Sequence, residues 1–141
     1  MKTETLFSSA KCEWETPLYL FEQLNKEFNF TLDVCALPEN AKVENYYTPQ
    51  LDGLRQDWSG VCWMNPPYGR DISKWMSKAV DSWRNGSTVV CLVPARTDTR
   101  WWHEYVVPYA EVRFIRGRIK FSGARNNAPF PSAIIIYRGV K

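Results

Sequence analysis

Apolar residues recur about every 3.6 positions in two stretches of the chain, which is the spacing of an amphipathic helix. The first stretch covers residues 17–28, with Thr16 as the expected N-cap and Pro17 at the first helical position. The second covers residues 72–83 and is followed by an Asn-Gly pair, which is typical of a helix end. A third, shorter helix is expected at residues 98–107.

Short continuous apolar runs lie between the expected helices, and such runs are typical of buried strands. Strands are expected at residues 30–36, 43–48, 61–64, 89–93, 111–115, 119–121 and 132–137. Because strands alternate with helices, we expect an α/β fold with a mostly parallel sheet and an antiparallel portion near the C-terminus. The strands at 111–115 and 119–121 flank an Arg-Gly-Arg turn, which favours a hairpin.

The length of 141 residues suits one domain with a single core. We expect residues 1–13 to be a flexible leader and residues 14–141 to form that domain. No apolar run approaches the roughly 18 residues of a membrane span, and the N-terminus lacks the apolar core of a signal peptide. A cytoplasmic protein without membrane contact is therefore expected.

The cysteines are scattered and form no Cys-x-x-Cys pair. They are Cys12, Cys35, Cys62 and Cys91. We expect them to be reduced thiols that act as small hydrophobic residues. Since His103 is the one histidine of the sequence, a zinc cluster is not expected, and the function inferred below requires no metal. A surface position, rather than a proton-accepting role, is expected for His103.

The net charge of +3 is distributed unevenly along the sequence. Residues 1–69 contain five Lys and Arg and ten Asp and Glu, a balance of −5. Residues 70–141 contain thirteen and five, a balance of +8. This asymmetry favours a polyanionic partner for the second half, with a solvated basic face as the alternative.

A stiff turn follows the expected strand at 61–64, at the sheet edge where open α/β sheets bind their ligands. Its sequence is Asn65-Pro66-Pro67-Tyr68. Two consecutive prolines remove two backbone donors and fix two φ angles. The Asn65 side-chain carbonyl and the Pro66 backbone carbonyl are placed to accept from an exocyclic amine, and Tyr68 to stack on its ring. An ordinary proline turn is the alternative.

Four further segments complete a recognisable pattern with the Asn-Pro-Pro-Tyr turn. They are Trp-Glu-Thr-Pro at 14–17, Asp-Val-Cys-Ala at 33–36, and the segments 94–101 and 128–132. From Trp14 to Arg138 the chain resembles the Dam-type DNA N6-adenine methyltransferases of phages and prophages. The resemblance implies a class I, Rossmann-like methyltransferase domain with helices on both faces of the sheet. No separate target-recognition domain is expected, because the loop between Ala36 and Asn65 is too short to hold one.

The implied reaction moves a methyl group from S-adenosylmethionine to N6 of adenine in double-stranded DNA. The base is expected to flip out of the duplex into the Asn-Pro-Pro-Tyr site. The implied catalytic residues are Asn65, Pro66, Pro67 and Tyr68. Methylation of RNA or of a protein glutamine amide is an alternative, because related Asn-Pro-Pro motifs serve both. A nucleic-acid-binding decoy with a degenerate site is the non-enzymatic alternative.

The resemblance also implies a cofactor site. Its residues are Trp14, Thr16, Pro17, Asp33, Cys35, Ala36, Asp57 and Asn65. Asp33 is implied to meet the methionine moiety, with a buried carboxylate satisfied by loop amides as the alternative. Asp57 is implied to lie near the cofactor's adenine, with a helix or turn cap as the alternative. The family's glycine-rich loop is absent, since residues 35–38 read Cys-Ala-Leu-Pro, so small residues have to allow the close backbone approach.

Basic residues of the second half are the expected phosphate contacts of the DNA. They are Arg96 and Arg100, just past the strand at 89–93, and Arg116, Arg118, Lys120 and Arg125 in the expected hairpin and loop. An aromatic side chain often fills the stack that a flipped base leaves. Trp101, Trp102 and Phe130 are candidates, and a place in the core is the alternative for each.

Overall fold

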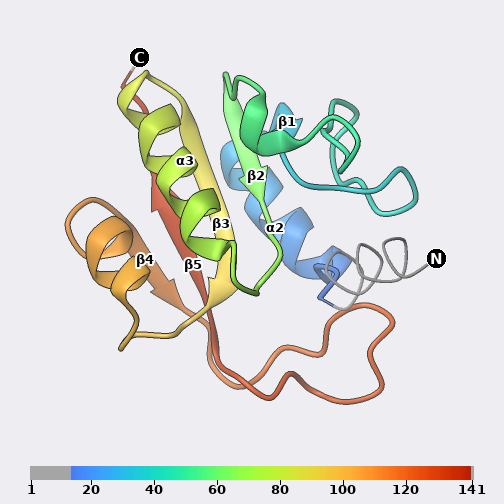
Figure 1. Ribbon diagram of the computed structural model, residues 1–141. Coiled ribbons are helices and arrows are strands. Elements are labelled where there is room, and N and C mark those ends of the chain that lie inside the picture. Colours follow the sequence, from blue (N-terminus) through green and yellow to red (C-terminus); the bar gives the residue numbers. More distant parts are fainter. Residues whose placement is uncertain (1–13, 141) are drawn as a thin grey trace.

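The computed structural model describes residues 14–140 as an α/β fold with a five-stranded sheet in the order β1-β2-β3-β5-β4. The strands are β1 (Leu32–Asp33), β2 (Val61–Met64), β3 (Thr88–Pro94), β4 (Glu111–Phe114) and β5 (Ser132–Tyr137). β1, β2 and β3 pair in parallel, whereas β5 is antiparallel to its neighbours β3 and β4. β4 therefore runs in the same direction as β3, and β5 is reversed between them (Figure 1).

The two α-helices of the described chain lie on opposite faces of this sheet (Figure 1). α2 (Leu18–Phe28) lies behind β2 and packs the Phe21 ring against Trp63, with ring centroids 5.5 Å apart. α3 (Ile72–Arg84) crosses the front and packs on β3 and β5. The described residues also contain two short helical elements, the 3-10 helix η1 (Gly53–Arg55) and the π-helix η2 (Trp102–Val106).

The long elements agree with the apolar pattern. β2 and β5 begin and end at the expected residues, and β3 is one residue longer at each end. α3 ends before the expected Asn-Gly pair, where Gly86 adopts a φ of 107°. The helix expected at 98–107 is the short element η2, whose turn is of the π type. The reversed strand β5 is the expected antiparallel portion, and it lies inside the sheet.

The expected hairpin at 111–121 is wrong. β4 pairs with β5, and residues 119–121 form no strand with it. Gly117, with a φ of 76°, turns the chain away from the sheet into the long loop 115–131. The backbone of residues 119–122 makes its hydrogen bonds outside the sheet. Ile119 O accepts from Ala128 N at 2.8 Å, and Ser122 N donates to Glu15 O at 2.9 Å.

Two other expected strands are much shorter than the sequence indicates. The run at 30–36 gives only the two-residue β1, because Asp33 begins a loop held by its own carboxylate. The run at 43–48 is reduced to a single parallel bridge between Tyr46 and Asp33. The two segments lie next to each other at the edge of the sheet and are joined by three backbone hydrogen bonds, among them Tyr47 N to Asp33 O at 2.9 Å.

The expected N-cap of α2 is also wrong. Pro17 occupies the N-cap position, with φ −60° and ψ 139°, and the helix begins at Leu18 with no side-chain cap. The Thr16 hydroxyl instead accepts a hydrogen bond from the Asn65 side chain. The Thr16 hydroxyl therefore binds Asn65 at the end of β2 and does not cap α2.

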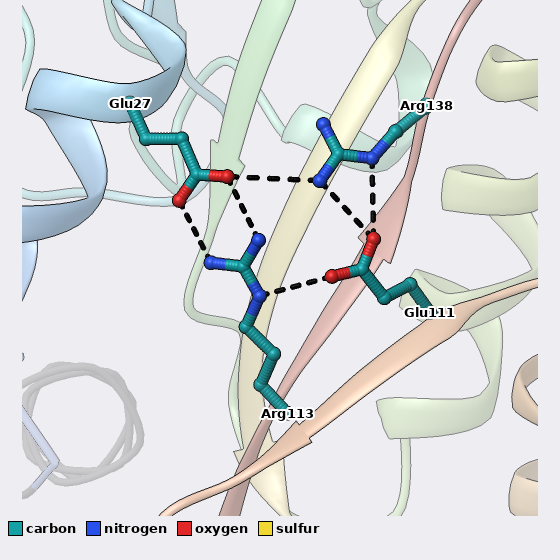
Figure 2. A network of polar contacts seen from close by, with 4 residues as sticks. All are labelled: Glu27, Glu111, Arg113 and Arg138. Carbon is teal, nitrogen blue, oxygen red and sulfur yellow. Dashed lines mark hydrogen bonds and ion pairs between the residues drawn. The ribbon is translucent and has the colours of Figure 1, made fainter.

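Four charged residues form a network of ion pairs and hydrogen bonds at the surface (Figure 2). Arg113 of β4 donates to both carboxylate oxygens of Glu27 on α2, at 2.7 and 2.8 Å. Arg138 bonds Glu111 at 3.1 Å and lies 3.6 Å from Glu27. The network joins α2 to β4 and to the residue that follows β5.

Several sequence expectations concern chemistry rather than fold. Cys62 and Cys91 are buried free thiols, as expected, and Cys35 is buried as well. Cys12 and the expected leader at 1–13 lie outside the described residues. Within residues 14–140, no three His, Cys, Asp or Glu side chains gather as a possible metal site. No helix in that same part of the chain is long and apolar enough to cross a membrane.

Candidate active site

Three strand ends meet at one edge of the sheet, as the parallel arrangement requires. β1 ends at Asp33, β2 leads directly into Asn65, and β3 leads into the segment that carries Arg96. The Arg96 guanidinium reaches back to this edge, since its Nη1 donates to Tyr68 O at 3.4 Å. The expected catalytic turn and the expected cofactor loop are therefore neighbours.

The Asn65 side chain is held at both of its polar atoms. Its Nδ2 donates to Trp14 O at 2.7 Å and to Thr16 Oγ1 at 2.9 Å. Its Oδ1 accepts from the Tyr68 hydroxyl at 2.7 Å. An amide oxygen has two lone pairs, so the Tyr68 hydroxyl occupies only one of them. The carboxamide is thus oriented with its nitrogen toward the segment before α2.

An aromatic cluster surrounds the Tyr68 ring, which is only 6% exposed. The Trp14 ring lies nearly parallel to it, at 13° and 6.3 Å between centroids. Phe121 and Phe130 meet Tyr68 edge-on, at 6.3 and 5.7 Å. Burial raises the pKa of Tyr68 well above its ordinary value, so the hydroxyl stays protonated and donates. The ring that is expected to stack on a base is therefore covered by Trp14.

A cavity of about 410 Å³ opens beside the catalytic turn. It is lined by Val34, Cys35, Tyr47, Thr48, Pro49, Asp52, Gly53, Leu54, Pro67, Asp71, Lys74 and Trp75. A narrow recess next to it is bordered by Thr16, Asp33 and Asn65, and Cys35 borders both. The loop after β1 therefore separates a roomy pocket from the side chain of Asn65.

Asp33 is buried at 2% exposure and organises the loop that follows it. Its carboxylate accepts from the backbone N–H of Cys35 at 3.2 Å and of Lys42 at 3.1 Å. The sequence allows two interpretations of Asp33, a contact to the methionine moiety or a buried carboxylate bound by loop amides. These two hydrogen bonds are the ones that the second interpretation predicts. Ala36 and Pro17 are buried as well, and neither lines the cavity or the recess.

Two acids line the cavity, Asp52 and Asp71, and neither was among the expected cofactor residues. Asp57 is exposed and outside the cavity, and its backbone carbonyl accepts from the Tyr47 hydroxyl at 2.7 Å. The Asp52 side chain accepts from Leu54 N at 3.2 Å, which caps η1. The Asp-Gly pair at 52–53 is a turn signal in the sequence that could have identified this loop.

Gly53 allows its loop to approach the chain after β1 closely. A Cβ placed on Gly53 would lie 2.2 Å from the Val34 backbone oxygen and 3.1 Å from the Trp75 ring. No side chain fits at that distance. Gly53 therefore holds together two segments that line the cavity.

The expected DNA contacts are all exposed side chains. Arg116, Arg118, Lys120 and Arg125 lie on the loop 115–131, drawn in orange to red in Figure 1, and Arg96 and Arg100 lie after β3. Arg100 bonds Glu104 at 3.2 Å. Arg125 borders a hollow of about 740 Å³ that Trp14 also lines. The basic loop therefore comes close to the aromatic cluster.

The three aromatic candidates for base replacement differ in burial. Trp101 and Trp102 are 7% and 5% exposed and pack edge-on, which places both in the core. Phe130 is half-buried and contacts Trp14 at 5.0 Å, with Arg96 over its ring at 5.9 Å. His103 is exposed, and its Nε2 lies 2.8 Å from Thr97 O.

Comparison with known proteins gives a consistent result. The profile of the family "DNA N-6-adenine-methyltransferase (Dam)" matches residues 3–138. A DNA N-6-adenine-methyltransferase of Haemophilus phage HP1 is 37% identical over 117 residues, which cover 80% of this chain and 68% of the phage protein. Another, of Escherichia phage T1, is 30% identical over 106 residues, which cover 72% of this chain and 44% of that protein.

Proposed function

The chain belongs to the DNA N-6-adenine-methyltransferase (Dam) family, and we propose that it methylates N6 of adenine in double-stranded DNA with S-adenosylmethionine as the donor. The observation that carries the proposal is the Asn65 side chain, held at a strand end beside a cavity of about 410 Å³. The Tyr68 hydroxyl occupies one lone pair of the Asn65 oxygen, and the second lone pair suits an exocyclic amine.

We assign the fold to the class I, Rossmann-like methyltransferases, with residues 14–141 as one domain in which the segment between Ala36 and Asn65 is too short to hold a target-recognition domain. Support comes from the reversed strand β5 between β3 and β4 and from helices on both faces of the sheet. Open sheets of this kind bind ligands outside the carboxyl ends of their strands. The cavity and Asn65 lie at that edge.

S-adenosylmethionine supplies, when bound, an electrophilic methyl group on a sulfonium. The cavity fits such a ligand, since its volume of 410 Å³ lies within the range of about 300–1,000 Å³ for small-molecule sites. Its walls are mainly apolar, with Tyr47 and Trp75 for a flat ring and Asp52 for hydroxyl or amine groups. Cys35 and Asp33 belong to the loop that faces the donor from the side of Asn65.

The free lone pair of Asn65 Oδ1 and the Pro66 carbonyl accept the two N–H groups of the adenine amine. These bonds favour a more tetrahedral nitrogen and strengthen as positive charge develops on it, so they stabilise the transition state more than the bound substrate. Pro67 stiffens the turn and lines the donor cavity. The amine proton leaves to solvent after transfer, so no dedicated base is required.

The target base has to leave the duplex to reach Asn65. A base that stacks on Tyr68 has to enter beside or displace the Trp14 ring, which lies nearly parallel to the Tyr68 ring with centroids 6.3 Å apart. The exposed basic side chains of the loop 115–131 contact phosphates near the vacated position. Phe130, beside Arg96, is the aromatic side chain that is best placed to support the remaining stack.

The test is incubation of purified protein with unmethylated DNA and labelled S-adenosylmethionine, followed by sequencing that maps methylated adenines. Asn65→Ala should abolish transfer while calorimetry still shows donor binding. Asn85→Ala, an exposed position at the far end of α3, is the matched control and should remain active. Preferential labelling of RNA or of a glutamine peptide, or no binding of the donor, would overturn the proposal.

A further inference from the structure

Both amide protons of Asn65 are taken by the segment before α2. The Trp14 carbonyl accepts at 2.7 Å and the Thr16 hydroxyl accepts at 2.9 Å, although these residues are 51 and 49 positions away in the sequence. We propose that Thr16 is a positioning residue for Asn65 in methyl transfer, and that with the Trp14 carbonyl it makes position 65 selective for an amide over a carboxylate. This inference rests on the proposed function.

The need for such a device follows from the chemistry of a carboxamide. Its oxygen accepts and its nitrogen donates, and a half-turn of the group exchanges the two. A reversed Asn65 would present N–H groups to the N–H groups of the substrate amine. Two acceptors on one side and the donating Tyr68 hydroxyl on the other favour one orientation. The oxygen is therefore held for substrate before any substrate binds.

The Thr16 hydroxyl is well suited to this role because its surroundings fix it. Thr16 is only 2% exposed, and its backbone carbonyl accepts from Ser122 Oγ at 3.4 Å. Ser122 N also bonds Glu15 O at 2.9 Å. The segment that orients Asn65 is thus anchored to the loop 115–131. The anchored backbone keeps the Thr16 oxygen within hydrogen-bond distance of the Asn65 amide.

An aspartate at position 65 would meet a different environment. A carboxylate has no N–H, so its oxygen would face the Trp14 carbonyl oxygen across the present 2.7 Å hydrogen bond. Thr16 could turn its hydroxyl and donate, but the Trp14 carbonyl cannot. Protonation of the acid would restore one donor. Asn65→Asp should therefore gain activity relative to wild type as the pH falls.

Other titratable groups face position 65 and belong to that comparison. The recess beside it is bordered by Glu15, Asp33, Cys35 and Lys42, with Glu15 and Lys42 paired at 3.4 Å. Tyr68 bonds the side-chain oxygen, and Arg96 lies on the Tyr68 carbonyl. Because wild type contains the same neighbours, the ratio of the two activities isolates the group at position 65.

The first experiment compares Thr16→Val with Thr16→Ser. Valine keeps the shape and removes the hydroxyl, so kcat should fall by about tenfold or more, as expected for loss of an interaction used in the transition state. Donor affinity measured by calorimetry should not change. Serine keeps the hydroxyl and should restore kcat. Thr88→Val is the control, since Thr88 Oγ1 accepts from Gly139 N at 2.9 Å at the opposite edge of the sheet.

Two outcomes would overturn the inference. If Thr16→Val weakens donor binding and leaves kcat at saturating donor unchanged, Thr16 is a cofactor contact instead. If Thr16→Val and Thr88→Val lower the melting temperature alike and leave kcat alike, the hydroxyl is only structural. Equal activity of Asn65→Asp and wild type at every pH would show that position 65 is not selective for an amide over a carboxylate.

A measurement without catalysis separates this inference from the proposed function. The Asn65 side-chain NH₂ signals can be identified by NMR from their loss in Asn65→Ala. In wild type both protons should exchange slowly with solvent, and in Thr16→Val one should exchange rapidly. Fast exchange of both in wild type contradicts the positioning role. A wild-type protein that methylates no adenine, with slow exchange intact, contradicts only the proposed function.

Discussion

The Tyr68 hydroxyl donates a 2.7 Å hydrogen bond to Asn65 Oδ1, the same oxygen that is proposed to accept from the substrate amine. The hydroxyl oxygen also lies 3.2 Å from Leu92 O, so its single proton is shared between Asn65 and a residue of strand β3. Its pKa is raised by burial, and it remains a donor across the physiological range. Tyr68 therefore has two separable parts, a ring and a hydroxyl.

Tyr68→Phe should separate those parts. The ring remains for stacking, and Asn65 is still oriented by its two acceptors, so kcat should stay within about threefold of wild type. The lost hydrogen bonds should lower the free energy of unfolding by about 1–2 kcal/mol. Steady-state kinetics and urea denaturation measure the two effects. A large fall in kcat with unchanged stability would show that the hydroxyl takes part in catalysis.

The sequence predicted the positions of the strand ends better than the contacts made there. The Asn-Pro-Pro-Tyr turn and the Asp33 loop were placed at one sheet edge because apolar runs and parallel pairing are local and regular patterns. The partner of Thr16 lies 49 residues away, and nothing in the local pattern distinguishes that bond from a helix N-cap. Capping rules alone assigned the hydroxyl to α2.

The lining of the cavity also depends on contacts between distant residues that local sequence patterns do not show. The resemblance implied Asp57, just before β2, as the acid near the cofactor's adenine, whereas the acids that line the cavity are Asp52 and Asp71. The loop 47–54 folds back over the end of β1, so the lining residue depends on a tertiary arrangement rather than on distance along the chain. Likewise Trp101 and Trp102 could not be told from base-replacing side chains until their burial was known.

Gly53→Ala should damage the donor cavity. The added methyl group would lie 2.2 Å from the Val34 oxygen, and the shift that relieves this clash should cost about 1–3 kcal/mol of stability. Affinity for S-adenosylmethionine should fall with it, because Val34 and Trp75 line the same cavity. Calorimetry and thermal denaturation measure both.

The control for that substitution is Gly69→Ala. Gly69 has no atom within 4 Å of an added Cβ, so donor affinity and stability should be unchanged. Unchanged donor affinity in Gly53→Ala would place the donor outside this cavity.

The basic loop 115–131 should carry the salt dependence of DNA binding. Each of Arg116→Ala, Arg118→Ala and Arg125→Ala should weaken binding at low salt. Each should reduce the slope of log K against log salt by about 0.9 for every phosphate that the variant no longer neutralises. Fluorescence anisotropy at several salt concentrations measures the slope, and donor affinity should not change.

Arg84→Ala is the matched control for the loop variants. Arg84 is an exposed arginine at the end of α3, and it lies over the Tyr109 ring at 4.9 Å. It is not on the loop 115–131, so its removal should leave the slope as in wild type. Equal slopes in the loop variants and in Arg84→Ala would mean that the loop makes no phosphate contacts.

The four-residue network of Figure 2 should contribute stability that depends on pH. Hydrogen bonds from Arg113 lower the pKa of Glu27 and of Glu111 below the ordinary value of 4.5. A folded-state pKa below the unfolded value stabilises the fold at pH above 4.5, and the contribution is lost as the pH falls through the lowered pKa. The residues are well exposed, so solvent screens each pair.

Arg113→Met should therefore destabilise the protein by about 1 kcal/mol at pH 7 in low salt, the size expected for a network of exposed pairs. The difference from wild type should shrink below pH 4.5, where Glu27 and Glu111 become protonated, and also in high salt. Urea denaturation at pH 7 and in acid measures it. Arg55→Met is the control, because Arg55 is 85% exposed and lies 3.8 Å from Asp52 in an isolated pair. A loss of stability in Arg113→Met that is the same at all pH values would assign the effect to the contact of the guanidinium with the Phe28 ring, 5.9 Å from its centroid, rather than to the ion pairs with Glu27 and Glu111.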